Sequence, residues 1–235
     1  MRADEVAVVI PARDEEPTIA AVVLGARAAL PGAPVLVVDD GSRDGTGGAA
    51  SAAGARVITL APAAGYAGAL RAGYRAALAG GARAVLQLDA DGQHDPADLP
   101  ALLAALAHHD LVLGSRFLGA GAPYRVPVGR RAGIAACRWM AAHVGGLRLT
   151  DPTSGYRALR ADVAARLAAE GFPRDLTESS LLIALHRGGV RVGEVPARMR
   201  APSGRSMHAG LAGGAHFLRI SAAVLALAAH RTAGE

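Results

Sequence analysis

The sequence predicts one α/β domain in which helices cover both faces of a mostly parallel sheet. Three observations lead to this class. Short apolar runs alternate with longer amphipathic segments in the first half of the chain. The runs are apolar throughout, which is typical of parallel strands buried on both faces. The chain has 235 residues and is 51% hydrophobic, so it can bury one sizeable core.

The first half contains four successive β-then-α units, which make parallel strands because each crossover helix returns the chain to the same end of the sheet. Pro17 and Pro96 suit the first turn of a helix, where no N–H is needed, and Pro31 with Gly32 ends the first helix. The predicted strands are 6–10, 35–38, 56–60, 84–88 and 111–113. The predicted helices are 17–30, 44–53, 66–79 and 96–107.

Beyond Ser115 the alternation stops, and a Gly/Pro-rich loop and a polar segment at 150–157 interrupt the pattern. We expect helices at 129–143, 161–169, 177–187 and 210–230, and a strand at 190–195. Residues 1–208 are expected to form the domain. Residues 209–235 are expected to form a C-terminal helix that packs on the domain or lies at a membrane interface. Within 129–143 we expect Cys137 and Trp139 in the core and Arg138 on the surface.

Composition excludes several classes of protein. High hydrophobicity argues against disorder, and a single Cys argues against a disulfide-stapled module. The N-terminus shows no signal-peptide pattern, and no charge-free run reaches the roughly 18 apolar residues of a spanning helix.

The charge is divided unevenly along the chain. Residues 1–110 carry a net charge of −5 and residues 111–235 a net charge of +10, and every basic residue is Arg. An acidic half followed by a basic half suggests a site for metal and phosphate, or a face for an anionic partner. Nucleic acid is not the expected partner, because the chain's few aromatic residues are not interleaved with basic ones.

Polar loops at 11–16, 39–45 and 89–95 follow three of the predicted strands. In open α/β sheets, ligands bind at the carboxyl ends of the strands. We therefore expect these three loops to converge on one ligand.

Asp89 and Asp91 directly follow a predicted buried strand, and alternation would turn both carboxylates to the same side. Hard divalent cations take oxygen ligands and keep substrate phosphates in their shell. Gln93 adds a further candidate oxygen. Asp95 either caps the helix that begins at Pro96 or, with His94, supports the metal ligands.

Asp39 and Asp40 follow the second strand and could accept hydrogen bonds from a nucleobase or ribose, with Gly41 allowing close approach. The alternative is ordinary turn and capping chemistry. The segment from Pro11 to Glu15 is open to the same two interpretations.

Several segments together resemble a known family. They are VVIPARDEE at 8–16, VLVVDDGSRDGT at 35–46, LQLDADGQHDP at 86–96 and GSRF at 114–117. In this order and spacing they resemble the inverting GT-A glycosyltransferases of family 2. DPTSGYRAL at 151–159 and VPARMRAPSGRS at 195–206 are similar to the branch of dolichyl-phosphate mannose synthase and bacterial polyprenyl-phosphate sugar transferases. The resemblance covers roughly residues 6–220.

The resemblance implies a Rossmann-like GT-A catalytic domain and assigns roles to residues. The nucleotide pocket would be lined by Pro11, Arg13, Glu15, Asp39, Asp40 and Gly65. Mg²⁺ or Mn²⁺ would be held by Asp89, Asp91 and Gln93. The sugar and acceptor would be bordered by Arg116, Arg131 and residues 154–157. Phosphate would be bound by Arg200 and Arg205. The residues implied in catalysis are Asp89, Asp91, Arg116, Arg131, Arg200 and Arg205.

The implied reaction is inverting, metal-dependent transfer of a sugar from a GDP- or UDP-sugar to a polyprenyl phosphate. Such an enzyme would be cytoplasmic, peripheral at the inner face of the cell membrane, and could work with a membrane-protein partner. One alternative is a hydroxyl acceptor with Glu178 as base, although Glu178-Ser179 stands where many hydroxyl-using relatives carry Glu-Asp. Another alternative is a non-catalytic nucleotide-sugar-binding module, since Ala63 replaces an Asn common in related sequences.

Overall fold

The computed structural model describes residues 2–119, 128–170 and 178–200. Its strands are β1 (Val6–Ala12), β2 (Val35–Asp39), β3 (Arg56–Thr59), β4 (Ala84–Gln87), β5 (Leu111–Ser115), β6 (Arg157–Arg160) and β7 (Val192–Pro196). Its α-helices are α1 (Glu16–Ala29), α2 (Thr46–Ala52), α3 (Gly65–Ala79), α4 (Leu99–Ala105), α5 (Val128–His143), α6 (Ala161–Ala168) and α7 (Glu178–Arg187). Two short 3₁₀ helices are η1 (Ala3–Glu5) and η2 (Pro96–Asp98).

The strands form one seven-stranded sheet in the order β3-β2-β1-β4-β6-β5-β7. The sheet is parallel except for β6, which runs antiparallel to both β4 and β5. The predicted fold class, a mostly parallel sheet with helices on both faces, is confirmed.

The strand β6 is absent from our sequence prediction, which has only a polar segment at 150–157 and a helix from 161. The strand reads Arg-Ala-Leu-Arg, and two apolar residues between two arginines are too short a run to signal a strand. Pairing with the neighbouring strands β4 and β5 makes this segment a strand. Ala158 pairs with Leu86 on one side and with Val112 on the other, and is fully buried.

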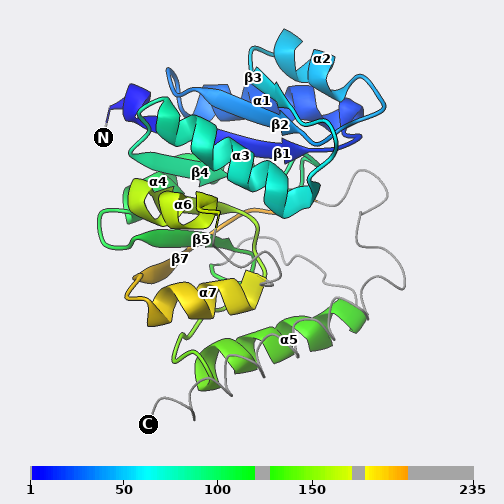
Figure 1. Cartoon of the computed structure of the whole chain (residues 1–235). Coiled ribbons are helices and arrows are strands. Elements are labelled where there is room, and N and C mark those ends of the chain that lie inside the picture. The colour runs from blue at the N-terminus through cyan, green and yellow to red at the C-terminus, as the bar shows by residue number, and fades with distance from the viewer. Residues whose placement is uncertain (1, 120–127, 171–177, 201–235) are drawn as a thin grey trace.

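The two faces of the sheet carry separate apolar cores, which alternate along β1. Val6, Val8 and Ile10 pack in the core beneath α1, α2 and α4, whereas Ala7 and Val9 pack in the core beneath α3, α6 and α7. Figure 1 shows these helices on opposite faces, with α5 lying outside α7. Complete burial of β1 explains why its sequence is apolar at every position.

β1 continues through Pro11, although the sequence analysis ends this strand at residue 10. The amide of Val8 donates to the carbonyl of Pro34, so the odd-numbered residues of β1, Pro11 included, face β4. The last β1–β4 pair in register is Val9 with Gln87. Pro11 lies beyond that pair, so its missing N–H costs the sheet no hydrogen bond.

The side chains of α5 partly reverse the sequence prediction. Cys137 is buried as expected. Trp139, however, is 59% exposed and stacks on His143, with ring centroids 4.9 Å apart. Arg138 is half-buried, and its guanidinium carbon lies 4.3 Å from the centroid of the Phe117 ring. The planar guanidinium can stack on an aromatic face, which allows Arg138 to take the inner position.

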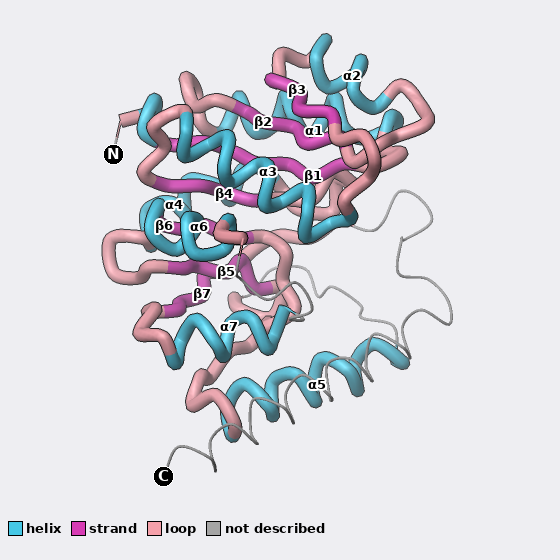
Figure 2. Tube along the Cα trace, in the orientation of Figure 1, coloured by secondary structure: helices cyan, strands magenta, loops and turns pink. Residues whose placement is uncertain are grey.

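Because β1, β2 and β4 are parallel, the loops that follow them meet at one edge of the sheet (Figure 2). This edge is the place where the sequence predicts a ligand. Within the three described ranges, no helix is both long enough and apolar enough to cross a membrane. The predicted tail at 209–235 lies outside the described residues.

Candidate functional site

The first two loops at this edge hold each other by reciprocal hydrogen bonds. The amide of Asp14 donates to Ser42 Oγ at 3.0 Å, and the amide of Arg43 donates back to Asp14 Oδ1 at 2.7 Å. The amide of Glu15 donates to Thr46 Oγ1 at 2.8 Å. Asp14 adopts a positive φ of 53°, a conformation that Asp tolerates better than most residues. The two predicted nucleotide loops are therefore one structural unit, with Arg13 exposed on it.

Asp39 and Asp40 are buried and hold loop backbone. Asp39 Oδ1 accepts from the amide of Ser42 at 2.9 Å. Asp40 Oδ1 and Oδ2 accept from the amides of Ala64 and Gly65 at 2.6 and 2.9 Å. Gly65 begins α3 with a φ of +76°, which favours glycine. Asp40 thus anchors the loop between β3 and α3, where Ala63 replaces the expected Asn. Contact of Asp39 or Asp40 with a base or ribose stays a prediction.

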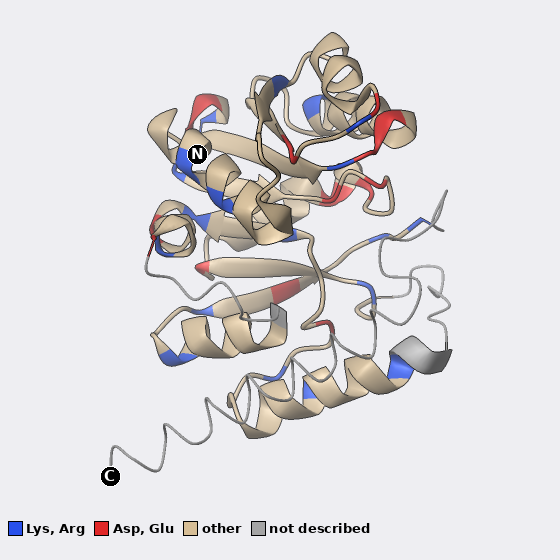
Figure 3. Cartoon of the chain, turned by 45° about the vertical axis from the view of Figure 1, so that its right-hand side comes forward, with Lys and Arg blue, Asp and Glu red and all other residues tan. Residues whose placement is uncertain are grey.

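Asp89 and Asp91 lie in a turn, not in a strand. β4 ends at Gln87, and the turn closes at Gly92 with a φ of +73°. Alternation along a strand therefore does not orient them, although Ala90 between them is buried. Figure 3 shows acidic segments gathered at this end of the sheet.

The pKa of Glu15 indicates that these acids lie close together. Its pKa is raised, first because the side chain is partly buried and then because of the negative charges of Asp91, Asp44 and Asp89. The acids of the loops that follow β1, β2 and β4 therefore share one electrostatic environment. A cation is the group that such an environment attracts.

Gln93 binds the Asp91 carboxylate. Its backbone amide donates to Asp91 Oδ1 at 3.0 Å, and its side-chain Nε2 donates to Asp91 Oδ2 at 2.5 Å. The amide group of Gln93 therefore orients Asp91 in this structure. Its predicted role as a metal ligand stays a prediction.

His94 is a buried, neutral support of the same turn. Its Nδ1 accepts from the amide of Asp89 at 3.3 Å, so its ring proton is assigned to Nε2. Burial lowers the pKa of His94 despite the nearby charges of Asp89 and Asp91. The ring stacks on Tyr156 at 4.8 Å between centroids, and Tyr156 donates its hydroxyl to the carbonyl of Asp95 at 2.9 Å. This agrees with the expectation that His94 supports the predicted metal ligands.

Arg200 is brought beside this loop by backbone pairing. Its amide donates to the carbonyl of Gln93 at 2.8 Å. Its side chain is 67% exposed and lies 3.7 Å from Asp95 Oδ1, which is too far for a hydrogen bond. Asp95 also caps η2 by accepting from the amide of Ala97 at 3.1 Å, as expected. Arg200 is therefore well placed to turn toward an anionic ligand of the loop.

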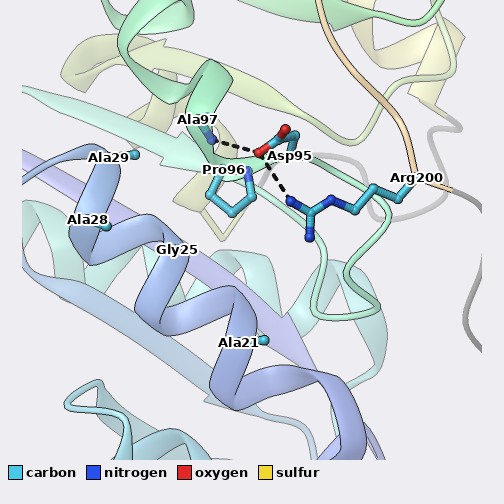
Figure 4. A pocket seen from close by; sticks show the side chains of 8 residues that line it. All are labelled: Ala21, Gly25, Ala28, Ala29, Asp95, Pro96, Ala97 and Arg200. Carbon is cyan, nitrogen blue, oxygen red and sulfur yellow. Dashed lines mark hydrogen bonds and ion pairs between the residues drawn. The ribbon is translucent and has the colours of Figure 1, made fainter. Parts of the chain in front are cut away.

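A pocket of about 400 Å³ opens between α1 and η2 beside the same segment (Figure 4). Its lining consists of Ala21, Gly25, Ala28, Ala29, Asp95, Pro96, Ala97 and Arg200. Neither Asp89 nor Asp91 lines it, so it is distinct from the acidic turn.

The remaining predicted cations are placed differently. Arg116 donates from Nε and Nη2 to the two oxygens of Asp151, each at 2.6 Å, and both side chains are buried. Arg131 is exposed on α5, which packs against α7. Arg205 lies outside the described residues. The structure thus brings Arg200, and not Arg116, to the acidic turn as an exposed cation.

The segment 154–157 does reach the turn. Ser154 Oγ donates to the carbonyl of Gly114 at 2.7 Å. A Cβ on Gly155 would lie 2.9 Å from Asp89 Oδ2, so only glycine fits without a shift. This close approach is consistent with the predicted place of 154–157 at the border of the site.

The residues of the turn fit a divalent metal that is shared with a substrate. Mg²⁺ is commonly bound by one or two carboxylates together with substrate phosphates. Asp89 and Asp91 supply such a pair. Among the described residues, no group of three or more His, Cys, Asp or Glu could hold a metal without outside ligands. Water molecules and donor phosphates are the ligands that would complete the shell of a cation held by this pair.

Comparison with known proteins decides the family. The family model "Glycosyl transferase family 2" matches residues 7–166, which include all the loops described above. The chain belongs to glycosyl transferase family 2. This confirms both the resemblance and the prediction of an enzyme, and it disfavours a non-catalytic binding module.

Two curated relatives of this family 2 glycosyltransferase are named for lipid acceptors. The chain is 35% identical over 190 residues to the undecaprenyl-phosphate mannosyltransferase of Micrococcus luteus, covering 72% of this chain and 73% of that protein. It is 33% identical over 167 residues to the polyprenol monophosphomannose synthase of Mycolicibacterium smegmatis, covering 68% of this chain and 63% of that one.

A solved structure supports the fold. Glucosyl-3-phosphoglycerate synthase of Mycobacterium tuberculosis, in complex with Mn²⁺, UDP and phosphoglyceric acid, matches with a TM-score of 0.71 at 26% identity. The match covers 94% of this chain and 78% of the other. Its bound Mn²⁺ and UDP agree with the expected divalent metal and nucleotide-sugar donor.

The sequence prediction lacks four residues that are linked by hydrogen bonds to predicted site residues. They are Tyr66, Gln87, Tyr74 and Asp151. Asp151 binds Arg116 and Tyr66 binds Asp89, at separations of 35 and 23 residues. Gln87 binds Tyr66, and Tyr74 binds Gln87. Only a buried polar residue inside an apolar strand, as at Gln87, could have drawn attention to them.

Proposed function

We propose that this glycosyltransferase transfers a sugar from a nucleotide diphosphate sugar to a polyprenyl phosphate, with inversion at the anomeric carbon and with Mg²⁺ or Mn²⁺. The observation that carries the proposal is the 35% identity to an undecaprenyl-phosphate mannosyltransferase over 73% of its length. A mannosyl donor is therefore the first to test, with GDP and UDP as the candidate nucleotides.

The residue that follows Glu178 favours a phosphate acceptor on chemical grounds. A phosphate monoester is already an oxyanion near neutral pH, since its second pKa is about 6, so it attacks without a general base. Ser179 stands where hydroxyl-using relatives carry an acid. It is 1% exposed, and its hydroxyl has no partner among the described residues. A buried, uncharged Ser179 cannot serve as a base.

A phosphate acceptor needs neutralisation and orientation, and Arg200 is suited to both. Its guanidinium is exposed and only loosely paired with Asp95. Arginine binds phosphate through a planar fork of donors. We assign Arg200 to phosphate, with Arg205 as a further candidate on the same segment of the sequence.

Asp89 and Asp91 would hold the cation against the donor diphosphate. When bound, the cation would neutralise the charge that develops on the leaving nucleoside diphosphate. Gln93 orients the Asp91 carboxylate through two hydrogen bonds. The first and second loops, locked to each other, would form the wall against the nucleotide.

A hydroxyl acceptor is the second candidate. The observation that favours it is the similarity to a solved glucosyl-3-phosphoglycerate synthase over 94% of this chain. In that case a base is needed, and Glu178 at the start of α7 is the candidate.

One experiment separates the two candidates. The full chain is incubated with Mn²⁺, with GDP-mannose, UDP-glucose or another nucleotide sugar, and with either undecaprenyl phosphate or 3-phosphoglycerate. Products are identified by mass spectrometry, and the anomeric configuration by NMR. We expect a glycosyl phospholipid of inverted configuration. Transfer to 3-phosphoglycerate with no transfer to undecaprenyl phosphate would contradict the proposal.

The lipid acceptor also places the reaction at a bilayer. We propose that the enzyme acts as a peripheral protein at the cytoplasmic face of the cell membrane, alone or with a membrane-protein partner. Co-sedimentation of the full chain with anionic liposomes tests this. We expect binding that weakens as salt rises, because the basic second half carries a net charge of +10. A chain that stays in the supernatant at low salt would require the partner.

A further inference from the structure

A chain of hydrogen-bonded side chains runs from the interior of the sheet to Asp89. The hydroxyl of Tyr74 donates to Gln87 Oε1. Gln87 Nε2 lies 3.0 Å from the hydroxyl of Tyr66, which lies 3.0 Å from Asp89 Oδ1. The four residues come from α3, β4 and the loop after β4.

The inner part of this chain is expensive to bury. Gln87 is fully buried in β4, and Tyr74 is 2% exposed. An amide in an apolar sheet destabilises the fold unless its hydrogen bonds are made. Here both polar atoms of the Gln87 amide are used, one for each tyrosine.

The charge of Asp89 sets the direction of every bond in the chain. An ionised carboxylate can only accept, so the Tyr66 hydroxyl must donate to it. The Tyr66 oxygen is then the acceptor for Gln87, which turns Nε2 toward Tyr66 and Oε1 toward Tyr74. Tyr74 must in turn donate. All three side chains therefore have one consistent arrangement while Asp89 is charged.

The two carboxylate oxygens of Asp89 therefore differ in their hydrogen bonding. Oδ1 is held by Tyr66, whereas Oδ2 accepts no hydrogen bond from the described residues. His94 Nδ1 lies 3.7 Å from Oδ2, but this nitrogen already accepts from the amide of Asp89 and carries no proton to donate. Gly155 leaves the space beside Oδ2 free of a side chain.

We propose that Tyr66 is a positioning residue for Asp89, and that Gln87 and Tyr74 act on Asp89 only through it. Tyr66 fixes the carboxylate by Oδ1 and keeps Oδ2 for the cation. This inference rests on the metal-dependent reaction proposed above and deepens it. Partners that orient metal ligands typically contribute 10- to 100-fold to metal affinity.

The test measures Mn²⁺ binding directly, without turnover, by electron paramagnetic resonance of free Mn²⁺ in the presence of GDP or UDP. Tyr66→Phe removes only the hydroxyl from a residue that is 40% exposed, but it leaves buried Gln87 Nε2 without its acceptor, so we expect a folded protein with a modestly lower Tm. We expect its Kd for Mn²⁺ to rise by about 10-fold. Ser51→Ala, which removes an exposed hydroxyl from α2, is the control and should bind Mn²⁺ as the wild type does.

A double-mutant cycle tests the route through Tyr66. Tyr74→Phe alone leaves Gln87 Oε1 without its donor, so we expect a lower Tm and a Kd for Mn²⁺ raised by a few-fold. In the Tyr66→Phe background, Tyr74→Phe should lower the Tm again but raise the Kd no further. A general loss of structure would instead multiply the two effects on Kd.

The outcomes are distinct. A Tyr66→Phe protein that binds Mn²⁺ within twofold of the wild type, or multiplicative effects in the double variant, would overturn the positioning role alone. A wild type that binds no Mn²⁺ with either nucleotide would overturn both this role and the metal dependence of the proposed function. Failure of the lipid acceptor would leave the binding measurements, and hence this inference, standing.

Discussion

The guanidinium of Arg116 and the carboxylate of Asp151 form a two-pronged ion pair, with Nε–Oδ2 and Nη2–Oδ1 distances of 2.6 Å. Asp151 is fully buried, and the Arg116 side chain is 5% exposed. The pair joins the end of β5 to the segment that leads into β6. Arg116 therefore holds Ser154 and Gly155 in place, and through them the space beside Asp89.

Breaking this pair should destabilise the fold. Asp151→Ala removes the carboxylate that pairs with the buried guanidinium of Arg116, and the expected loss is about 3–5 kcal/mol in the free energy of unfolding. Urea denaturation measures it. Asp162→Ala, which removes an exposed acid from the first turn of α6, is the matched control, with an expected change of at most about 1 kcal/mol. Equal stability of the two variants would show that Arg116 is solvated.

Removing a carboxylate from the acidic turn should stop catalysis without unfolding the chain. Among the described residues, Asp91 accepts hydrogen bonds from Gln93 alone, and it is half-buried, so Asp91→Ala should fold. We expect transfer to fall by about 100-fold or more, since a catalytic metal is worth several kcal/mol. Chelation of divalent metal should reduce the wild-type rate to the same level. The exposed Asp4→Ala is the control. Full activity of Asp91→Ala would refute the metal site.

The close approach of Gly155 to Asp89 gives a steric test of the same turn. In Gly155→Ala the new Cβ would lie 2.9 Å from Asp89 Oδ2 and 3.2 Å from the Tyr66 hydroxyl, so the carboxylate must move. We expect the Kd for Mn²⁺ in the presence of nucleotide to rise by about 10-fold with little change in Tm. Gly133→Ala on α5, where a Cβ meets nothing within 4 Å, is the control. Unchanged Mn²⁺ binding in Gly155→Ala would show that this space is not used.

The features that depend on local residue patterns could be predicted from the sequence. The loops at the sheet edge were predictable because apolar runs followed by Asp mark the ends of buried parallel strands. Asp95 was predictable as a cap because Pro96 follows it. Contacts made at long range were not predictable in this way. The partner of Arg116 lies 35 residues away, and that of Asp89 lies 23 residues away.

Tertiary packing also overrode local signals. The strand β6 exists because β4 and β5 leave a gap that Ala158 and Leu159 fill, and not because four residues favour a strand. Trp139 is exposed because α5 turns Arg138 toward Phe117. Both cases depend on the shape of a neighbour, which periodicity does not encode.

The acid Asp110 should make stability depend on pH. Its pKa lies well below the usual range, first because Arg191 donates side-chain hydrogen bonds to it, the shorter at 2.8 Å. A carboxyl whose pKa is lower in the folded state stabilises the fold above its unfolded pKa of about 3.9, and this contribution is lost as pH falls further. The Tm difference between wild type and Asp110→Asn should be constant from pH 5 to 7 and shrink below pH 4. Ser51→Ala, which removes an exposed hydroxyl and no charge, should show no such trend. A difference that is independent of pH would contradict the ion pair.

The acceptor chemistry can be tested at Glu178, which begins α7. If the acceptor is a lipid phosphate, no base is required, and Glu178→Gln should keep transfer to undecaprenyl phosphate within about threefold of the wild type. Loss of a general base typically costs 10²- to 10⁴-fold, so the two mechanisms differ by far more than the error of an initial-rate assay. The exposed Glu170→Gln is the matched control. A rate that falls 100-fold in Glu178→Gln and recovers as pH rises would mean that a hydroxyl is deprotonated at this site.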